Sequence, residues 1–354
     1  MTLGALCQSE VCVIEMRTHE GRLDDALITA WTLLCDDDPA ATVFHTPRFL
    51  RVWRDVFAPT LPSRIHTFHA DNHLVGVIAD VNDVENGPSG PQEIRRFQGG
   101  IDVTDYLGPV CRPEYRADVL QAYFTHLARD VHWDEFVATG LACENKTADA
   151  VRSAAVASGL TVIDDDEDGV CPAVSLTDGF DAYLAGLPGR QRQELQRKSR
   201  KLQRDLGEIH LHEVSPEEYH GRLEAFIAMA SESHPDKSAF FARPGMVQFF
   251  GALGDEFVAD RTLRLHELTV GGLPAASTLS FVHNGVWGLY NSAYAPSLEG
   301  YGPGVVLITM LIEQAAQENC HTFDLLRGDE AYKYRFGATD QPLQRIVLAR
   351  GGDA

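Results

Sequence analysis

The segment LRLHELTVGGLPAASTLSFVHNGVWGLYNSA, residues 263–293, decides the fold of the second half of the chain. It contains apolar runs separated by short turns, in the order Leu263–Val270, Gly271-Gly272, Ala275–Val282, Asn284-Gly285 and Val286–Ala293. Asn-Gly supplies the two positive φ angles that a tight hairpin turn needs. The segment therefore predicts an antiparallel meander of three strands.

The chain on either side of this meander alternates between helical and extended patterns. After it the sequence predicts a glycine-rich loop, a helix, a strand, a helical turn and a last strand: Pro296–Gly304, Val305–Gln317, His321–Leu325, Asp329–Tyr334 and Leu343–Leu348. Before it stand a strand and four helices: Ala173–Leu176, Gly179–Ala185, Arg190–Leu206, Pro216–Ser231 and Pro244–Phe257. Because the strand after the long helix must return parallel to the meander, we expect a mixed, mostly antiparallel α/β sheet flanked by helices.

The first half shows the same order of elements, with Gly, Asn and Asp in the turns between apolar runs. Its predicted strands are Val11–Met16, Arg64–Phe68, Leu74–Ala79, Arg95–Phe97, Tyr106–Val110, Glu135–Thr139 and Thr161–Ile163, and its predicted helices are Arg22–Leu34, Pro47–Val56, Glu114–Arg129 and Thr147–Ser158. One order seen twice predicts a tandem duplication with two domains, residues 1–168 and 169–354. The acidic run Asp164–Asp168 between them is expected to be a solvated linker.

The composition is that of a globular protein and excludes several other classes. Hydrophobic residues make up 44% and charged residues 23% of the 354 residues, which argues against disordered, collagen-like and coiled-coil chains. Thirty Lys and Arg against 51 Asp and Glu give a net charge of −21, which disfavours nucleic acid and anionic membranes as partners. Seven scattered cysteines without a C-x-x-C pair indicate neither a disulfide framework nor a zinc site.

Location and metal content can also be judged from the sequence. Met1–Cys12 has no Lys or Arg and only a broken apolar run, so it lacks the parts of a secretory signal. The uncharged stretch Leu268–Leu298 contains glycines and prolines that indicate hairpins rather than a membrane span. We therefore expect a cytoplasmic protein. His210 and His212 share one face of a strand, but no third ligand is near, so no metal site is expected.

The loop between the meander and the long helix, EGYGPGV at residues 299–305, has glycines where a backbone must approach something closely. Free amides at a helix start and the positive end of the helix dipole both attract an anion, the dipole contributing roughly 0.3 to 2 kcal/mol. Pro303 suits a first helical turn. The loop predicts a phosphate site, although a tight structural turn explains the same glycines.

The order meander, glycine-rich loop, helix and strand resembles the Gcn5-related N-acetyltransferase (GNAT) fold. In that family a Q/R-x-x-G-x-G/A loop holds the pyrophosphate of coenzyme A, and Gly302 and Gly304 match its glycines, whereas Glu299 replaces the leading Gln or Arg. The resemblance implies acetyl-CoA or another acyl-CoA as co-substrate. The donor-binding residues that it implies are Ser292, Tyr294, Gly300, Tyr301, Gly302, Gly304 and Val305.

The stretch FDLLRGDEAYK, residues 323–333, narrows this resemblance. It is similar to the signature of the CelD/BcsL-like acetyltransferases, which resemble the FemAB peptidyltransferases in carrying two tandem GNAT domains. FHTPRFLRVW at residues 44–53, TDYLG at residues 104–108 and the basic helix after Leu187-Pro188 are further matches in the same order. The resemblance thus covers most of the chain.

Charged residues at the end of the strand His321–Leu325 lie where open α/β sheets place ligands. The expected catalytic residues are Asp324, Arg327, Asp329, Tyr332 and Lys333. Tyr332 could donate a proton to the departing thiolate, and Asp324 or Asp329 could accept one from an attacking amine. Structural roles are the alternative: Asp329 as a helix N-cap or a partner of Lys333, and Arg327 as an ion-pair partner of Asp324.

Substrate contacts are expected from both halves. The loop after the third strand of the first half lacks the later glycines, so that domain is expected to hold no cofactor; Asp105 and Tyr106 are predicted either to shape an acceptor pocket between the domains or to anchor the core. The helix Arg190–Leu206 carries a basic stripe that includes Arg197 and Lys201. In an acidic chain this stripe predicts contact with an anionic ligand, and a solvated amphipathic helix is the alternative.

These features together predict an acyltransferase that moves an acetyl or other acyl group from acyl-CoA to an amine or hydroxyl of a small-molecule or saccharide acceptor. Two alternatives stand beside it: an aminoacyl-tRNA-dependent ligase of the FemAB kind, and a non-catalytic binding protein in polysaccharide assembly. The net charge of −21 counts against tRNA, while the basic stripe counts partly for it. The sequence does not indicate an oligomeric state.

Overall fold

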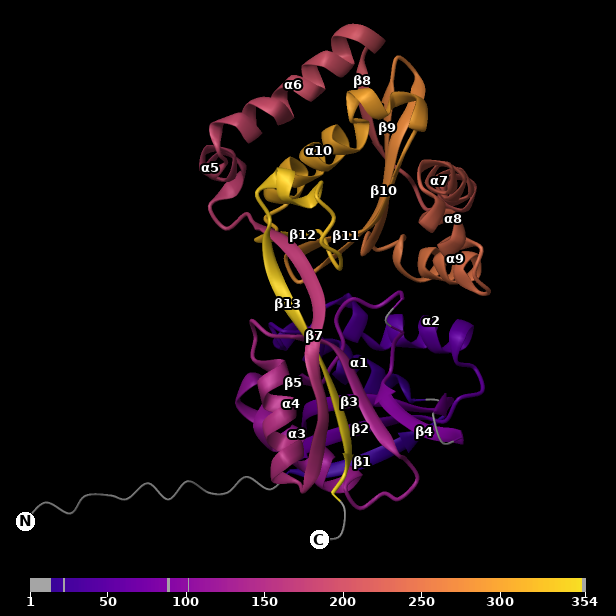
Figure 1. Cartoon of the computed structure of the whole chain (residues 1–354), viewed down its shortest axis with the longest axis vertical. Coiled ribbons are helices and arrows are strands. Elements are labelled where there is room, and N and C mark those ends of the chain that lie inside the picture. The colour runs from indigo at the N-terminus through magenta and orange to yellow at the C-terminus, as the bar shows by residue number, and fades with distance from the viewer. Residues whose placement is uncertain (1–13, 22, 88–89, 101, 352–354) are drawn as a thin grey trace, which may run out of the picture.

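The structure is a computed structural model that describes residues 14–21, 23–87, 90–100 and 102–351. Two units are stacked along the longest axis of the molecule, and two long strands run through both of them (Figure 1). The segment Met1–Cys12, with its expected lack of a signal, lies outside the described residues. No helix in the described ranges is long and apolar enough to cross a membrane.

Among its described residues, the first unit contributes five strands to the main sheet and a short strand that pairs with one of them. Its strands are β1 (Glu15–Glu20), β2 (Ser63–Ala70), β3 (His73–Gly87), β4 (Gly90–Phe97), β5 (Val110–Cys111) and β6 (Glu135–Ala142), and its helices are α1 (Asp25–Asp37), α2 (Pro47–Phe57), α3 (Arg116–Leu127) and α4 (Thr147–Ala157). Asp71 and Asn72 have φ angles of 49° and 64°, which confirms the predicted tight turn between β2 and β3.

The second unit is built around the predicted meander. Its strands are β8 (Ile209–Glu213), β9 (Leu263–Val270), β10 (Leu273–His283), β11 (Val286–Tyr294) and β12 (Thr322–Asp324), and its helices are α5 (Gly179–Gly186), α6 (Gly189–Leu206), α7 (Tyr219–Ser233), α8 (Pro235–Phe241), α9 (Met246–Phe257) and α10 (Pro303–Gln317). β9, β10 and β11 pair antiparallel and β12 returns parallel to β11, as expected. The short helix α8 was not predicted.

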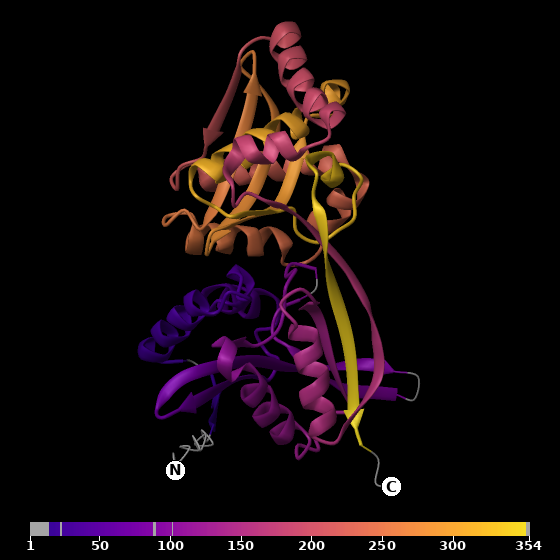
Figure 2. The same ribbon diagram turned by 90° about the vertical axis from the view of Figure 1, so that its left-hand side faces the viewer.

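The described strands form one continuous sheet in the order β1-β2-β3-β4-β6-β13-β7-β12-β11-β10-β9-β8, with β5 beside β3. The strands β7 (Leu160–Ser175) and β13 (Thr339–Arg350) pair antiparallel with one another, and their lower ends belong to the first unit (Figure 2). β13 also pairs with β6, so the last strand of the chain completes the sheet of the first unit. The result is the predicted mixed, mostly antiparallel α/β fold in two units.

The acidic run Asp164–Asp168 is part of β7, so the expectation of a linker is wrong. Its carboxylates are accommodated by cross-strand partners: Arg345 pairs with Asp164, and Gln344 Nε2 donates to Asp165 at 2.7 Å. The periodicity of an acidic run does not reveal a strand whose partner lies at the far end of the sequence. The division at residues 168 and 169 therefore falls inside a strand that both units use.

The two units share a hydrophobic core. Phe49 of α2 lies 5.8 Å from Phe249 of α9 and 6.1 Å from Phe281 of β10, measured between ring centroids. Arg48 adds ion pairs from α2 to Glu256 at 2.8 Å and to Asp260. Separate clusters fill the outer faces, under α3 and α4 in the first unit and under α5, α6 and α10 in the second. Packing therefore fixes the first unit against the second.

The contribution of β13 to the first unit can be tested with Ile346, which is fully buried under α4. Ile346→Ala is expected to lower the free energy of unfolding by about 2 to 5 kcal/mol, since a buried aliphatic side chain leaves a cavity. Urea unfolding measures the loss. Arg350→Ala, at the exposed end of the same strand, is the control and should change little. A loss below about 0.5 kcal/mol for Ile346→Ala would contradict this packing.

Candidate functional site

The candidate site lies where β11 and β12 separate. Their parallel pairing covers only Val286–Gly288 with Thr322–Asp324, and β11 continues to Tyr294 without β12 beside it. A register shift opposite Leu279 and Ser280 leaves Tyr290 as the extra residue of a bulge in β11. The Tyr290 hydroxyl donates to the Val103 carbonyl at 2.7 Å, which ties this end of the opening to the first unit.

Asp324, the last residue of β12, is buried at the base of this opening. Tyr106 of the first unit donates its hydroxyl to Asp324 Oδ2 at 2.7 Å, and the Leu326 amide donates to Asp324 Oδ1 at 2.7 Å. Burial raises the pKa of Asp324 to about 7, although these two hydrogen bonds act in the opposite direction. At neutral pH this carboxyl group can therefore both give and accept a proton.

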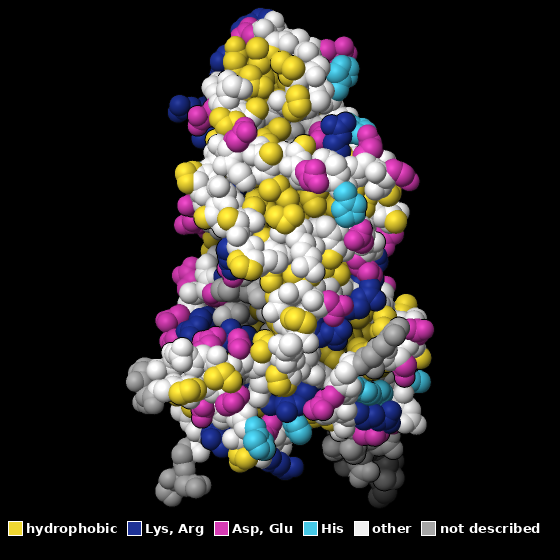
Figure 3. All heavy atoms as spheres, turned by 90° about the vertical axis from the view of Figure 1, so that its right-hand side faces the viewer, with side chains coloured by type: hydrophobic (Ala, Val, Ile, Leu, Met, Phe, Trp, Pro, Cys, Tyr) yellow, Lys and Arg dark blue, Asp and Glu magenta, His cyan; other side chains and the backbone are white. Residues whose placement is uncertain are grey.

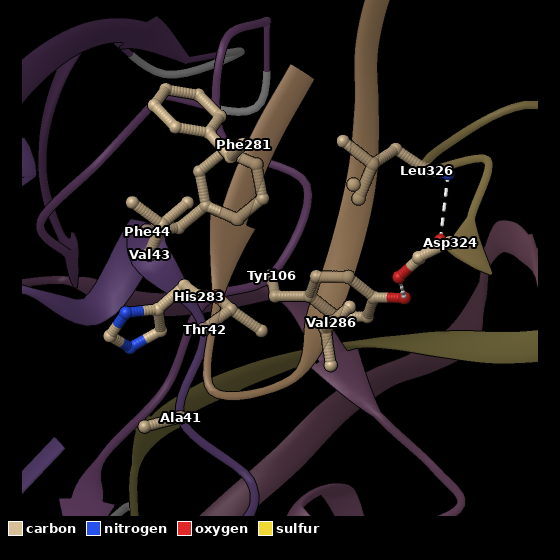
Figure 4. A pocket seen from close by; sticks show the side chains of 11 residues that line it. Ala41, Thr42, Val43, Phe44, Tyr106, Phe281, His283, Val286, Asp324 and Leu326 are labelled. Carbon is tan, nitrogen blue, oxygen red and sulfur yellow. Dashed lines mark hydrogen bonds between the residues drawn. The ribbon is translucent and has the colours of Figure 1, made fainter. Parts of the chain in front are cut away.

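A small cavity between the units reaches Asp324 and Tyr106 (Figure 4). Phe44 and Phe281 line its far side, and its volume is about 40 Å³, which is about the share of one water molecule. Asp105 lies next to Tyr106, and burial raises the pKa of Asp105 to about 6, while Arg327 and Lys333 act against that rise. The first unit thus brings a hydroxyl and a second weakly acidic carboxyl group to Asp324.

Lys333 holds the loop that follows β12. Its Nζ atom donates to the carbonyl oxygens of Leu326, Arg327 and Gly328 at 2.8, 2.8 and 3.0 Å, and it pairs with Glu330 at 2.9 Å. Leu326 has a φ of 57°, a left-handed conformation that costs energy for a side chain of this size. The three carbonyl contacts keep the loop in this conformation, so the geometry gives Lys333 a structural role.

Arg327 reaches back to β7 rather than to Asp324. It donates to the Asp168 carbonyl oxygen at 2.7 Å and to the Asp168 carboxylate at 3.1 Å. The same carboxylate accepts the Gly140 amide of β6 at 2.6 Å. The expected Arg327–Asp324 ion pair is therefore replaced by an Arg327–Asp168 pair that joins the loop to β7 and, through the Gly140 amide, to β6.

Asp329 and Tyr332 occupy different environments. Asp329 is exposed and has no hydrogen-bond partner among the described residues, and Lys333 pairs with Glu330 instead. Tyr332 is partly buried against the core of the second unit and lies beside Ser292 of β11. Burial raises the pKa of Tyr332, and the nearby Glu330 raises it further. Of these two residues, the structure brings only Tyr332 to the opening between β11 and β12.

The glycine-rich loop forms a short 3-10 turn, Pro296–Tyr301, that leads directly into α10. Gly302 joins the two with a φ of 67°, and its amide donates to the Glu299 carbonyl at 2.9 Å. Val305 is buried in the core, while a Cβ atom added at Gly300 or Gly304 would meet nothing within 4 Å. The loop therefore presents open space in front of the first turn of α10.

Helix α6 lies across this loop and places lysines against it. Lys201 Nζ lies 4.5 Å from the centre of the Tyr301 ring and 3.4 Å from the Gly300 carbonyl oxygen. Lys198 Nζ would lie 2.7 Å from a Cβ atom added at Gly302. Arg197 pairs with Glu194 on its own helix at 2.7 Å, and Lys198 approaches the same carboxylate at 3.7 Å. Lys198 was not among the expected site residues, because its position on the helix wheel lies outside the basic stripe.

The edge of β11 at Ser292 also carries a group that the sequence did not single out. The Ser292 amide donates to Asn291 Oδ1 at 2.9 Å, and Lys237 of α8 donates to the Ser292 carbonyl oxygen. Burial lowers the pKa of Lys237 to about 8. The scarcity of lysine, five residues against 25 arginines, is the sequence signal that could have drawn attention to it.

The described residues include no group of three or more metal-ligating side chains. His210 and His212 lie on β8 and approach Glu208 and Glu218 at 3.4 and 3.5 Å. On the face over α7–α9 and α2, basic, acidic and apolar side chains are intermixed (Figure 3). The described residues of that face form no continuous basic surface of the kind that binds a nucleic-acid backbone.

The pKa of Asp324 makes stability depend on pH. An unfolded Asp has a pKa near 3.9, so the folded pKa of about 7 means that the contribution of Asp324 is complete below the unfolded value and is lost as pH rises through 7. Between pH 5 and 8 the wild type should lose roughly 2 to 3 kcal/mol more unfolding free energy than Asp324→Asn. Asp329→Asn is the exposed control. Parallel pH curves for wild type and Asp324→Asn, from urea unfolding, would contradict the assigned pKa.

Comparison with known proteins places this geometry in a known fold. Residues 189–334 match the family model described as an acetyltransferase (GNAT) domain. The matched range contains the meander, the glycine-rich loop and the loop that Lys333 holds. No curated protein matches the sequence at a significant level.

Solved structures resemble the whole chain at low sequence identity. FemX superposes with a TM-score of 0.65 at 8% identity, over 92% of this chain and 96% of that protein. A protein of unknown function from Bacteroides thetaiotaomicron gives 0.57 at 13% identity, over 93% and 99%. The C-terminal domain assigned to a lysylphosphatidylglycerol synthetase from Agrobacterium fabrum gives 0.55 at 12% identity, over 92% and 91%. The chain therefore has a mixed α/β fold in two tandem units, which it shares with FemX over 92% of its length, and residues 189–334 of the second unit match a GNAT acetyltransferase domain.

Proposed function

We propose that this protein transfers an acetyl or other acyl group from acyl-CoA to an amine or hydroxyl of a small-molecule or saccharide acceptor. The observation that carries the proposal is the open space in front of α10, bordered by Gly300, Gly304 and two lysines, beside the place where β11 and β12 separate. An acyl-CoA whose pyrophosphate is held there would have its thioester directed along the edge of β11 that β12 does not pair with. The CelD/BcsL-like acetyltransferases remain the family that the sequence motifs favour.

In this proposal the coenzyme A pyrophosphate lies against the first turn of α10. The free amides and the helix dipole attract it, and Lys198 and Lys201 supply positive charge. Lys198 stands close to Gly302 and takes the part that the family gives to the leading Gln or Arg, where this chain has Glu299. Gly300, Tyr301, Gly302, Gly304 and Val305 form the backbone of this site. Arg197, paired with Glu194, lies further out as a contact for an anionic part of a substrate.

The acyl group then lies along β11 at Ser292 and Tyr294, and the acceptor enters from the first unit. Asp324 accepts the proton of the attacking amine, because its pKa lies near neutrality. Tyr106 and Asp105 orient Asp324 and the acceptor, and Tyr332 gives a proton to the departing thiolate. Lys333 and Arg327 keep the loop in place, and Asp329 lies at its exposed edge.

The domain assignment follows from these roles. Residues 1–168 would serve the acceptor and residues 169–354 the acyl donor, with β7 and β13 shared by both. The described cysteines are all free, which suits the reducing cytoplasm as the compartment.

Donor binding can be tested with Gly304→Val, because a Cβ atom at Gly304 meets no protein atom. Acetyl-CoA is expected to raise the melting temperature of the wild type, and the variant should lose that shift while melting normally without ligand. Gly302→Val is less suitable, because a positive φ and the contact with Lys198 would destabilise the fold itself. Absence of any wild-type shift at millimolar acetyl-CoA would exclude the donor. A shift without transfer to any amine or saccharide would favour a non-catalytic binding protein.

The fold similarity to FemX over 92% of the chain favours a second candidate, an aminoacyl-tRNA-dependent peptidyltransferase. The basic helix α6 would then contact the RNA backbone. If tRNA binds, its affinity should fall steeply with salt, by about 0.7 to 0.9 log units per log unit of salt for each phosphate contacted. Filter binding between 50 and 200 mM salt measures that slope. Under the acyl-CoA proposal we expect no measurable tRNA binding, since the chain carries a charge of −21.

A further inference from the structure

Lys237 reaches the edge of β11 that faces away from β10 and that β12 does not pair with. The pairing of β11 with β12 ends at Gly288, four residues before Ser292. Ser292 directs its amide to the Asn291 side chain and its carbonyl oxygen to Lys237, so both backbone groups face away from β10. This free edge is where the proposed function places the acyl group. The ammonium group of Lys237 therefore stands beside that position.

Lys237 differs from Lys333 in how its hydrogen bonds are used. Lys333 donates to three carbonyl oxygens, which are all the hydrogen bonds that an ammonium group can make. Lys237 donates to a single acceptor among the described residues, the Ser292 carbonyl oxygen. Two of its N–H groups remain for a ligand. A half-buried ammonium with unused donors is costly unless a ligand supplies the missing acceptors.

The charged groups around Lys237 have opposing effects on the pKa of its ammonium group. Burial is the largest influence on its pKa and lowers it to about 8; Glu330 raises it and Lys333 lowers it. On its own helix, Asp236 approaches His234 at 3.5 Å. The Tyr332 hydroxyl lies near the Ser292 side chain. Lys237 is therefore mostly protonated at neutral pH, yet it stands where a developing negative charge would be stabilised strongly.

Resting on the proposed function, we infer that Lys237 is a further catalytic residue: its ammonium group binds the thioester carbonyl oxygen beside the Ser292 amide. The acyl oxygen takes the place of Asn291 Oδ1 on that amide. Lys237, which lies next to the Ser292 carbonyl oxygen, then donates a second hydrogen bond to the same acyl oxygen. This geometry makes an oxyanion site from one backbone amide and one side chain.

The chemistry balances without any further reactant. The acceptor nitrogen forms a bond to the thioester carbon, and the carbonyl π electrons move to the oxygen, where Lys237 and the Ser292 amide hold the charge. The carbonyl re-forms as the carbon–sulfur bond breaks and the thiolate leaves. The proton from the nitrogen passes to Asp324, and the thiolate takes a proton from Tyr332; transfer of one proton from Asp324 to Tyr332 through solvent then restores both groups. Lys237 keeps its proton throughout.

The test uses acetyl-CoA labelled with ¹³C at the carbonyl carbon, so it needs no acceptor. In the wild type the bound carbonyl signal is expected to move downfield from the free signal, because two donors polarise the bond. Lys237→Met should lose most of that displacement, and Lys237→Arg should retain it. Lys146→Met, an exposed lysine of the first unit, is the matched control and should behave as the wild type.

Affinity and pH give two further readouts. Coenzyme A without an acyl group should bind wild type and Lys237→Met equally, whereas acetyl-CoA should bind Lys237→Met more weakly. Raising the pH through 8 should move the wild-type signal towards that of Lys237→Met, while Lys237→Arg stays unchanged because arginine remains charged. Melting curves without ligand establish that both variants are folded.

The outcomes separate this inference from the proposed function. If no bound signal appears in any protein, acyl-CoA is not the donor and both proposals fail. If acetyl-CoA binds and Lys237→Met shows the wild-type carbonyl signal, the inference about Lys237 is wrong and the proposed function stands. A bound signal that is displaced in wild type and Lys237→Arg alone supports the inference.

Discussion

The antiparallel pairing of β7 with β13 is the interaction on which the rest of the structure depends. It extends from Thr339 opposite Ala173 to Arg350 opposite Leu160, and each strand also borders another strand of either unit. Because the pairing runs through both units, it fixes the position of the first unit relative to the second along the direction of these two strands. Tyr106 can reach Asp324, and Asp168 can reach Arg327, only in that register.

Local patterns in the sequence are sufficient to predict most of the helices and strands and the glycine-rich loop. The Asn284-Gly285 turn has φ angles of 47° and 71°, as a tight hairpin requires, and the meander strands lie within a few residues of their predicted limits. These features depend on neighbours in sequence. The pairing of β13 with β6 joins residues about 200 positions apart and depends on no local pattern. For the same reason the acidic run was expected to be a linker, although its partners Gln344 and Arg345 were visible in the sequence.

The same distinction between local and long-range information applies to the site residues. The sequence predicted Asp324 and Tyr106 as site residues, but not that they form a hydrogen bond with each other. It could not distinguish a lysine whose N–H groups all bind a loop from a lysine with N–H groups that remain unpaired. Four of the five lysines lie at the opening between β11 and β12 or at the glycine-rich loop, in a chain that otherwise uses arginine. A compact ammonium group fits several carbonyl oxygens at once, which a planar guanidinium group does not. The choice of lysine rather than arginine at a position therefore points to the site, which the net charge of the chain does not reveal.

The position of β13 also has a consequence for how the chain is made. In the sheet of the first unit, β13 stands between β6 and β7, yet it is built from residues 339–350. During synthesis the sheet of the first unit therefore stays incomplete, with the edges of β6 and β7 uncovered, until residues 339–350 have emerged from the ribosome. Domains usually fold one after another as they are made, but here the first unit to be synthesised cannot be the first to finish folding. The two units must mature together, and the long wait exposes edges that other chains can pair with.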